Sequence, residues 1–138
     1  MPGDKRLVVR PRYVGPVSEQ SQVWQVVDGA TVIGTHASRQ DAAKQVLELG
    51  ARIALTWERS KVGGREGSHD FSAQFAFRDV GRTYKALGTG GPSYWAWSMY
   101  ALLDAKHHIG TSHGRCDDRL AAAIEVERAF TELLATPD

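Results

Sequence analysis

Four histidines and one cysteine are the first candidates for metal binding or acid-base chemistry: His69, His107, His108, His113 and Cys116. If residues 107 to 113 form one strand, six steps of about 3.3 Å separate the outer two rings by about 20 Å, which is too far to share a zinc ion. A looped backbone, or a ligand from His69, would bring such rings together. We favour histidines solvated on a hairpin, and therefore expect no metal site and no cofactor.

Cys116 stands three residues after His113, beside the expected start of a helix, where the helix dipole favours a thiolate. The adjacent carboxylates Asp117 and Asp118 oppose that effect. The chain also lacks a phosphate-binding loop that ends in Lys-Ser/Thr, a Gly-x-Ser-x-Gly elbow, a His-Glu-x-x-His motif and a Cys-x-x-Cys pair. We expect a structural thiol and no catalytic residues. The enzyme alternative requires His113 and Cys116 to converge, with His69 as an optional third residue.

Two segments share the order strand, strand, helix, which predicts an internal duplication. In the first segment, residues 22–27 are rich in β-branched and aromatic side chains, Asp28-Gly29 favours a tight turn, and residues 31–33 form a second run. Ser38 is then a candidate helix N-cap with Asp41 three residues on. Apolar residues at helical spacing predict a helix over about residues 39–57.

The second segment begins with an aromatic run at residues 94–103, turns at 104–106 and returns over 108–115. Asp117 or Asp118 then caps a second helix. The predicted apolar stripe of that helix is Leu120, Ala123, Ile124, Val126, Phe130 and Leu133. The alternative is that two ordinary hairpin-helix segments resemble each other by chance.

Glycine-rich stretches at residues 62–68 and 87–93 separate the two segments and favour linkers. They bracket one strand, in which Phe71, Ala73, Phe75 and Phe77 alternate with other residues and indicate burial on one face. We therefore expect an α+β fold with three parts: a strand-strand-helix unit over 1–67, a Phe-rich strand and linker over 68–92, and a second strand-strand-helix unit over 93–138. Each unit packs one helix on an antiparallel sheet, within one domain or as a pseudo-twofold pair.

Five residues of the first segment follow a recurring pattern: Trp24 in a strand, Gly29 in a short hairpin, and Ser38, Asp41 and Ala42 in a helix of the form Ser-x-x-Asp-Ala. Together with the extended residues 7–11 that precede them, they resemble a widespread family of small bacterial domains of unknown function. The resemblance covers residues 7–67. It implies a fold and no catalytic residues, because the family has no established activity.

Aromatic side chains on the second hairpin give the clearest sign of a partner. On a strand, Trp95 and Trp97 share one face, whereas Tyr94 and Tyr100 share the other. One helix covers one face, so the other face is available to a partner unless a second core layer covers it. We expect a non-catalytic protein-protein interaction factor, a regulatory inhibitor or adaptor, with Tyr94, Trp95, Trp97 and Tyr100 as anchors. A homodimer is a further option.

Basic residues support a competing hypothesis, in which a sheet face and the basic middle segment bind nucleic acid. The candidate phosphate contacts are Arg78, Arg82 and Lys85. Further basic residues lie near the N-terminus: Lys5, Arg6, Arg10 and Arg12. Acidic residues interrupt the middle segment and favour an ordinary solvated surface there: Glu58, Glu66, Asp70 and Asp79.

Length and composition are those of an ordinary globular domain: 138 residues, 42% hydrophobic and 24% charged. These values argue against disorder, collagen and coiled coil, and no apolar run is long enough for a membrane span. The 17 basic and 16 acidic residues exclude a strongly basic nucleic-acid binder. Residues 1–85 nevertheless hold 13 basic and 9 acidic residues, against 4 and 7 in residues 86–138. One cysteine, with no apolar leader, indicates a reducing cytoplasmic setting.

Overall fold

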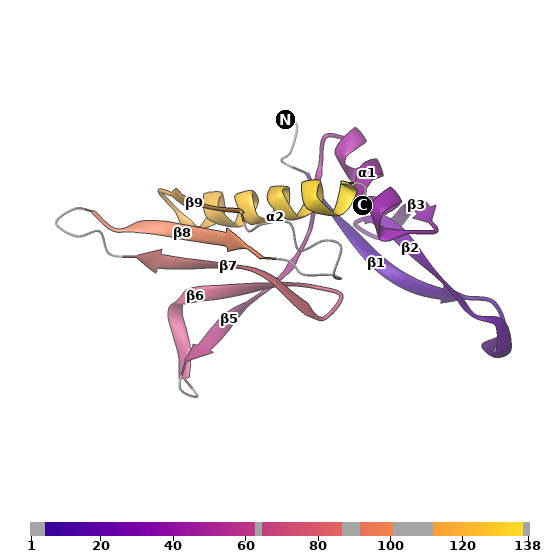
Figure 1. Ribbon diagram of the computed structural model, residues 1–138, viewed down its shortest axis with the longest axis horizontal. Coiled ribbons are helices and arrows are strands. Elements are labelled where there is room, and N and C mark those ends of the chain that lie inside the picture. The colour runs from indigo at the N-terminus through magenta and orange to yellow at the C-terminus, as the bar shows by residue number, and fades with distance from the viewer. Residues whose placement is uncertain (1–4, 63–64, 87–91, 101–111, 137–138) are drawn as a thin grey trace. The chain divides into compact units, whose positions relative to one another are not determined.

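The protein has an α+β fold with two antiparallel-rich sheets and two α-helices, described by a computed structural model for residues 5–62, 65–86, 92–100 and 112–136 (Figure 1). Contacts divide the chain into a first unit, Met1–Ala54 with Thr131–Asp138, and a second unit, Leu55–Phe130. The first unit thus ends before residue 67, the boundary that the glycine-rich stretch suggested.

The first unit contains a four-stranded sheet with the order β3-β2-β1-β4. Its elements are β1 (Arg6–Val14), the 3-10 helix η1 (Val17–Glu19), β2 (Ser21–Asp28), β3 (Thr31–His36), α1 (Arg39–Glu48) and β4 (Arg52–Ile53). β1 and β3 are antiparallel to β2, whereas β4 runs parallel to β1 over Arg6 and Leu7. The helix contacts all four strands and buries Ala42, Ala43 and Val46. Leu7, Val9 and Val26 are buried in the sheet and complete this core.

Local signals in the first hairpin and at the start of α1 are confirmed. Asp28 pairs with Thr31 across the turn, and Gly29 adopts the left-handed φ of 60° that this turn requires. The Ser38 hydroxyl accepts the Asp41 N–H at 3.1 Å, as an N-cap does. The helix ends at Glu48, earlier than residue 57, because Gly50 turns into the left-handed region at φ 68°. The chain then enters β4 and β5.

The second unit contains a five-stranded antiparallel sheet with strands in sequential order. The strands are β5 (Thr56–Val62), β6 (Arg65–Phe75), β7 (Arg78–Ala86), β8 (Tyr94–Met99) and β9 (Ser112–Cys116). The expectation of one strand between the hairpin units was therefore wrong. Val62 pairs with Arg65, so β5 and β6 form a hairpin where a linker was expected. Residues 101–111, which include the predicted turn at 104–106, lie outside the described residues.

Helix α2 (Arg119–Ala135) follows β9, and its residues up to Phe130 belong to the second unit. The Asp118 carboxylate accepts the Ala121 N–H at 2.7 Å, which identifies Asp118 as the capping residue. The buried residues of α2 include Ala122, Val126 and Phe130, whereas Leu120 is 68% exposed. The predicted stripe was therefore wrong at Leu120, because the helix turns this residue away from the sheet.

Both β2-β3-α1 and β8-β9-α2 place a helix after an antiparallel strand pair. The two sheets nevertheless differ in strand number and order, and the internal duplication stays a prediction. Within the described parts of the chain, neither helix has the length and apolar character that crossing a bilayer requires.

Candidate functional site

Helix α2 covers one face of the second sheet, and ladder pairing identifies the residues on that face. The Phe75 and Phe130 rings lie 4.9 Å apart, and the Arg119 guanidinium lies 4.5 Å from the Phe71 ring centre. Residues paired directly across strands project to the same side of a sheet. Phe71 pairs with Thr83, and Thr83 with Trp97, so this helix-covered face continues across three strands.

Both tryptophans of the second hairpin belong to the helix-covered face. Trp95 lies 6.4 Å from Phe71 between ring centres, and Trp97 pairs with Gly114. A Cβ atom at Gly114 would lie 2.7 Å from the indole Nε1 of Trp97, so glycine leaves the room that this ring occupies. Both indoles are half-buried. The four predicted anchors are therefore divided between two faces, and Tyr94 and Tyr100 lie on the other one.

The face of the second sheet away from α2, here called the open face, carries two arginine-tyrosine pairs. The Arg82 guanidinium lies 4.5 Å from the Tyr84 ring centre, and that of Arg115 lies 4.6 Å from the Tyr94 ring centre. Each guanidinium is placed to interact with the negative face of its ring. Tyrosine and arginine are among the residue types enriched at the centres of protein interfaces.

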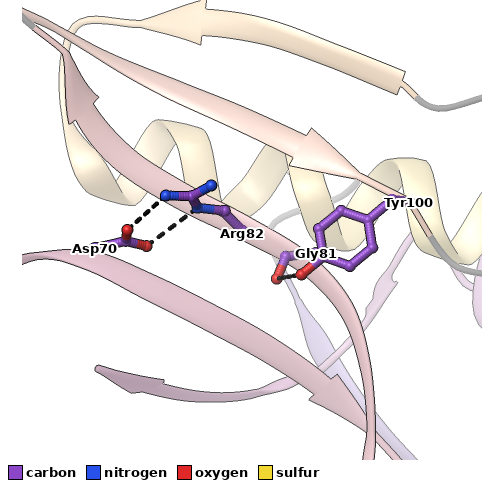
Figure 2. A network of polar contacts seen from close by, with 4 residues as sticks. All are labelled: Asp70, Gly81, Arg82 and Tyr100. Carbon is purple, nitrogen blue, oxygen red and sulfur yellow. Dashed lines mark hydrogen bonds and ion pairs between the residues drawn. The ribbon is translucent and has the colours of Figure 1, made fainter. Parts of the chain in front are cut away.

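Asp70 on β6 orients Arg82 on β7. The guanidinium donates to both carboxylate oxygens, from Nε at 3.2 Å and from Nη2 at 2.6 Å (Figure 2). This two-point geometry restrains the arginine more than a single bond would. The hydrogen bond to Asp70 raises the pKa of Arg82, so the guanidinium stays charged at every physiological pH.

Tyr100 follows β8 directly and lies beside β7 at one end of the open face. Its backbone N–H donates to the Val80 carbonyl at 3.0 Å, and its hydroxyl donates to the Gly81 carbonyl at 3.3 Å (Figure 2). Burial raises the pKa of the Tyr100 hydroxyl, and the nearby Asp79 carboxylate raises it further, whereas Arg82 lowers it. The hydroxyl therefore remains a neutral hydrogen-bond donor.

The three candidate phosphate contacts do not form one patch. Arg82 is paired with Asp70, whereas Lys85 pairs across the ladder with Trp95 and so lies on the helix-covered face. Arg78 lies at the first position of β7, opposite Phe75. Pairing with Ser72 places Glu58 on the open face, which therefore carries acidic as well as basic side chains. Such a face matches a protein surface of mixed charge better than a polyanion.

Phe77 is the functional candidate that sequence reasoning missed, since the alternating pattern predicted its burial with Phe71, Ala73 and Phe75. Those three are buried, but Phe77 is 99% exposed. Strand β6 ends at Phe75, and Ala76 and Phe77 form the two-residue turn to Arg78 with φ values of 49° and 68°. This turn type favours glycine or asparagine, so no turn residue in the sequence reveals it.

The histidine and cysteine candidates do not converge where the structure describes them. His113 pairs with Ser98 on the open face, whereas Cys116 pairs with Trp95 on the helix-covered face. Burial raises the pKa of the Cys116 thiol, and Glu125, Asp118 and Asp117 raise it further. His107 and His108 lie outside the described residues, and the side chain of His69 is likewise not described. Among the described residues, no three His, Cys, Asp or Glu side chains form a group able to hold a metal ion.

No protein-family model matches the chain, and no match was found among curated proteins or among solved structures. The resemblance of residues 7–67 to small bacterial domains therefore stays a prediction.

Proposed function

We propose that this protein is a non-catalytic binding protein that docks onto a partner protein through Phe77 and the adjoining open face. The observation that carries the proposal is the state of Phe77, a large apolar side chain that is 99% exposed at a φ of 68°. A left-handed backbone costs a non-glycine residue about 1–2 kcal/mol. Both features are unfavourable in the isolated chain, and they support a role in which a partner buries the ring.

The open face supplies the remaining contacts in this proposal. Tyr100 hydrogen-bonds Val80 and Gly81 of β7, three and four residues beyond Phe77, so an aromatic ring and a strained turn lie at the same end of that strand. Arg82 and Arg115, each stacked on a tyrosine, extend the surface across the sheet. The partner accordingly offers an apolar pocket for Phe77, surrounded by polar groups of both charges.

Tyr94 and Tyr100 keep their proposed roles as anchors, with Phe77, Arg82 and Arg115 added. Trp95 and Trp97 are no longer proposed as anchors, since they lie on the opposite, helix-covered face of the same sheet. The protein then acts as an adaptor or inhibitor, by occupying a surface of its partner in the reducing cytoplasm.

Site-specific photocrosslinking tests the proposal. A photoreactive benzoylphenylalanine replaces Phe77 in the full chain, and illumination of native cells is followed by mass analysis of the adducts. The matched control places the same residue at Val17, which is 90% exposed in η1 of the first unit. We expect a discrete protein adduct from position 77 and none from position 17. Equal adducts at both positions, nuclease-sensitive adducts, or adducts of two copies of this chain would each overturn the proposal.

A further inference from the structure

The two arginine-tyrosine pairs of the open face differ in what their guanidinium groups bind. Arg82 donates to both oxygens of Asp70, at 3.2 and 2.6 Å, so an acid of the same sheet engages its N–H groups. The Arg115 guanidinium lies 4.6 Å from the Tyr94 ring centre and forms no ion pair with a carboxylate of the described residues. Stacking engages the flat face of a guanidinium, whereas its N–H groups point outward in the plane. Arg115 is therefore an oriented cation whose N–H groups bind no acid in the described part of the chain.

Among the described residues, the acids of the open face lie away from Arg115. Strands β8 and β9 contribute five side chains to this face, none of them acidic: Tyr94, Ala96, Ser98, His113 and Arg115. Asp70 lies on β6, three strands from β9, which is about 14 Å at about 4.8 Å per strand. Glu58 lies one strand further, on β5, and accepts a hydrogen bond from Gln74. Asp79 lies beside Tyr100, at the other end of the face.

The two acids that follow β9 do not engage Arg115 either. Asp118 accepts the Ala121 N–H at 2.7 Å and caps α2. Asp117 is exposed and, among the described residues, forms no ion pair with Arg115. The open face is accessible at this point, since Arg115 is itself exposed. Ala96, a methyl group between Tyr84 and Arg115 in the ladder, is 8% exposed.

We infer that the partner protein places a carboxylate, from an aspartate or glutamate side chain, against the Arg115 guanidinium. The inference rests on the proposed function, because it assigns the chemistry of the group that the partner brings to the open face. Binding removes water from Arg115, and a guanidinium that loses its water without gaining an acceptor destabilises a complex. A carboxylate accepts from the planar guanidinium at two points, as Asp70 does from Arg82.

The sheet also sets the separation between this contact and the pocket for Phe77. Arg115 pairs with Ala96, which pairs with Tyr84. Tyr84 follows Phe77 by seven residues, or about 23 Å of strand, and β9 lies two strands, or about 10 Å, from β7. The partner therefore presents its acidic group about 25 Å from its apolar pocket. An interface of standard size, about 800 Å² on each protein, is wide enough to include both.

Binding of the full chain to the protein that is captured at position 77 tests the inference. Arg115→Gln removes the charge and should raise the dissociation constant by about 10- to 30-fold at low salt, and by less at high salt. Arg115→Lys keeps the charge without the two-point geometry and should raise it by about 3- to 10-fold. The matched control is Arg12→Gln, which removes an exposed arginine from β1 of the first unit and should leave the dissociation constant unchanged.

A second photocrosslink identifies the partner group. Benzoylphenylalanine in place of His113, two residues before Arg115 on the same face, should form an adduct with a partner peptide that contains aspartate or glutamate. Changing that acid to its amide should cause no further loss in the Arg115→Gln variant, because both changes remove the same contact. Additive losses would overturn the inference. Loss of the Arg115 dependence after phosphatase treatment of the partner would also overturn it, because a phosphate would then be the group bound.

The outcomes also separate this inference from the proposed function. Circular dichroism and urea unfolding establish that each variant folds like the unaltered chain. Weakened binding of Phe77→Gly together with unchanged binding of Arg115→Gln overturns the acidic contact alone. Unchanged binding of Phe77→Gly overturns the role of Phe77, and the Arg115→Gln result still decides the acidic contact. Absence of any protein adduct at position 77 overturns both.

Discussion

The Oε2 atom of Glu127 accepts the indole N–H of Trp57 at 3.2 Å, and thereby joins α2 to the first strand of the second sheet. The same oxygen accepts the backbone N–H of Leu55 at 2.9 Å. Glu127 is 1% exposed; its hydrogen bond from Leu55 is buried, and its hydrogen bond from Trp57 is partly buried. The contact holds the helix over the side of the sheet opposite the open face.

Replacing Glu127 with leucine is therefore expected to destabilise the protein by about 2–4 kcal/mol, because the buried Leu55 N–H and the partly buried Trp57 indole N–H lose this acceptor. Urea denaturation measures this change. Glu127→Gln is the matched control, since its amide oxygen still accepts a hydrogen bond, and we expect it to cost about 1 kcal/mol. Equal losses for leucine and glutamine would contradict the role assigned to the carboxylate.

Gly81 permits the close approach of α2 to β7. A Cβ atom at this position would lie 2.5 Å from Cγ1 of Val126 and 3.0 Å from the Ser98 carbonyl oxygen. Gly81→Ala should cost about 1–3 kcal/mol in a thermal or urea unfolding experiment. Adding Val126→Ala removes one of the two clashes, so the double variant should be less destabilised than the sum of the single changes.

Gly34→Ala is the comparison for Gly81→Ala. A Cβ atom at Gly34 would meet the end of the flexible Gln45 side chain, which can move aside. We therefore expect a smaller loss than at Gly81. A loss at Gly34 as large as the loss at Gly81 would show that the clash with the short Val126 side chain and the Ser98 carbonyl is not the deciding factor.

Cys116 should react slowly with alkylating agents, because burial, together with Glu125, Asp118 and Asp117, raises the pKa of its thiol. The thiolate is the reactive form, so the pH profile of iodoacetamide modification should lie above that of an unhindered thiol. Asp118→Asn keeps a capping side chain but removes a negative charge, and should shift the profile to lower pH. Asp41→Asn, at the start of α1 in the first unit, should leave it unchanged.

Features set by neighbours in sequence could be predicted, since their physics is local. The Ser38 cap and the Asp28-Gly29 turn each depend on a few adjacent residues, and both are present. The end of α1 was predicted late. Apolar spacing continued to residue 57, and the left-handed Gly50 outweighed that spacing.

Features set by distant residues could not be predicted in the same way. Strand alternation correctly separates Trp95 and Trp97 from Tyr94 and Tyr100. Which face receives the helix depends on Gly81 and Gly114, whose missing side chains make room for Val126 and the Trp97 indole. Phe77 continues an alternating pattern through a turn that contains no glycine, so its exposure follows from the register of β6 and β7 alone.

Replacing Phe77 with glycine relieves the backbone strain and removes the ring, so its effects on stability and on partner binding can be measured separately. Phe77→Gly removes the left-handed penalty of about 1–2 kcal/mol, and the greater freedom of glycine in the unfolded chain offsets about 0.4–1 kcal/mol. The variant should therefore be more stable by about 1 kcal/mol in urea denaturation. Ala76→Gly, with φ 49° in the same turn, should stabilise by a similar amount and is the matched control.

The affinity of the photocrosslinked partner for these two variants tests the central claim most directly. Burial of a phenylalanine side chain contributes about 1.5–3 kcal/mol to the binding free energy, so Phe77→Gly should raise the dissociation constant by about 10- to 100-fold. Ala76→Gly should bind like the unaltered chain. A Phe77→Gly variant that gains stability and retains full affinity would contradict the claim that the strained, exposed ring serves partner recognition.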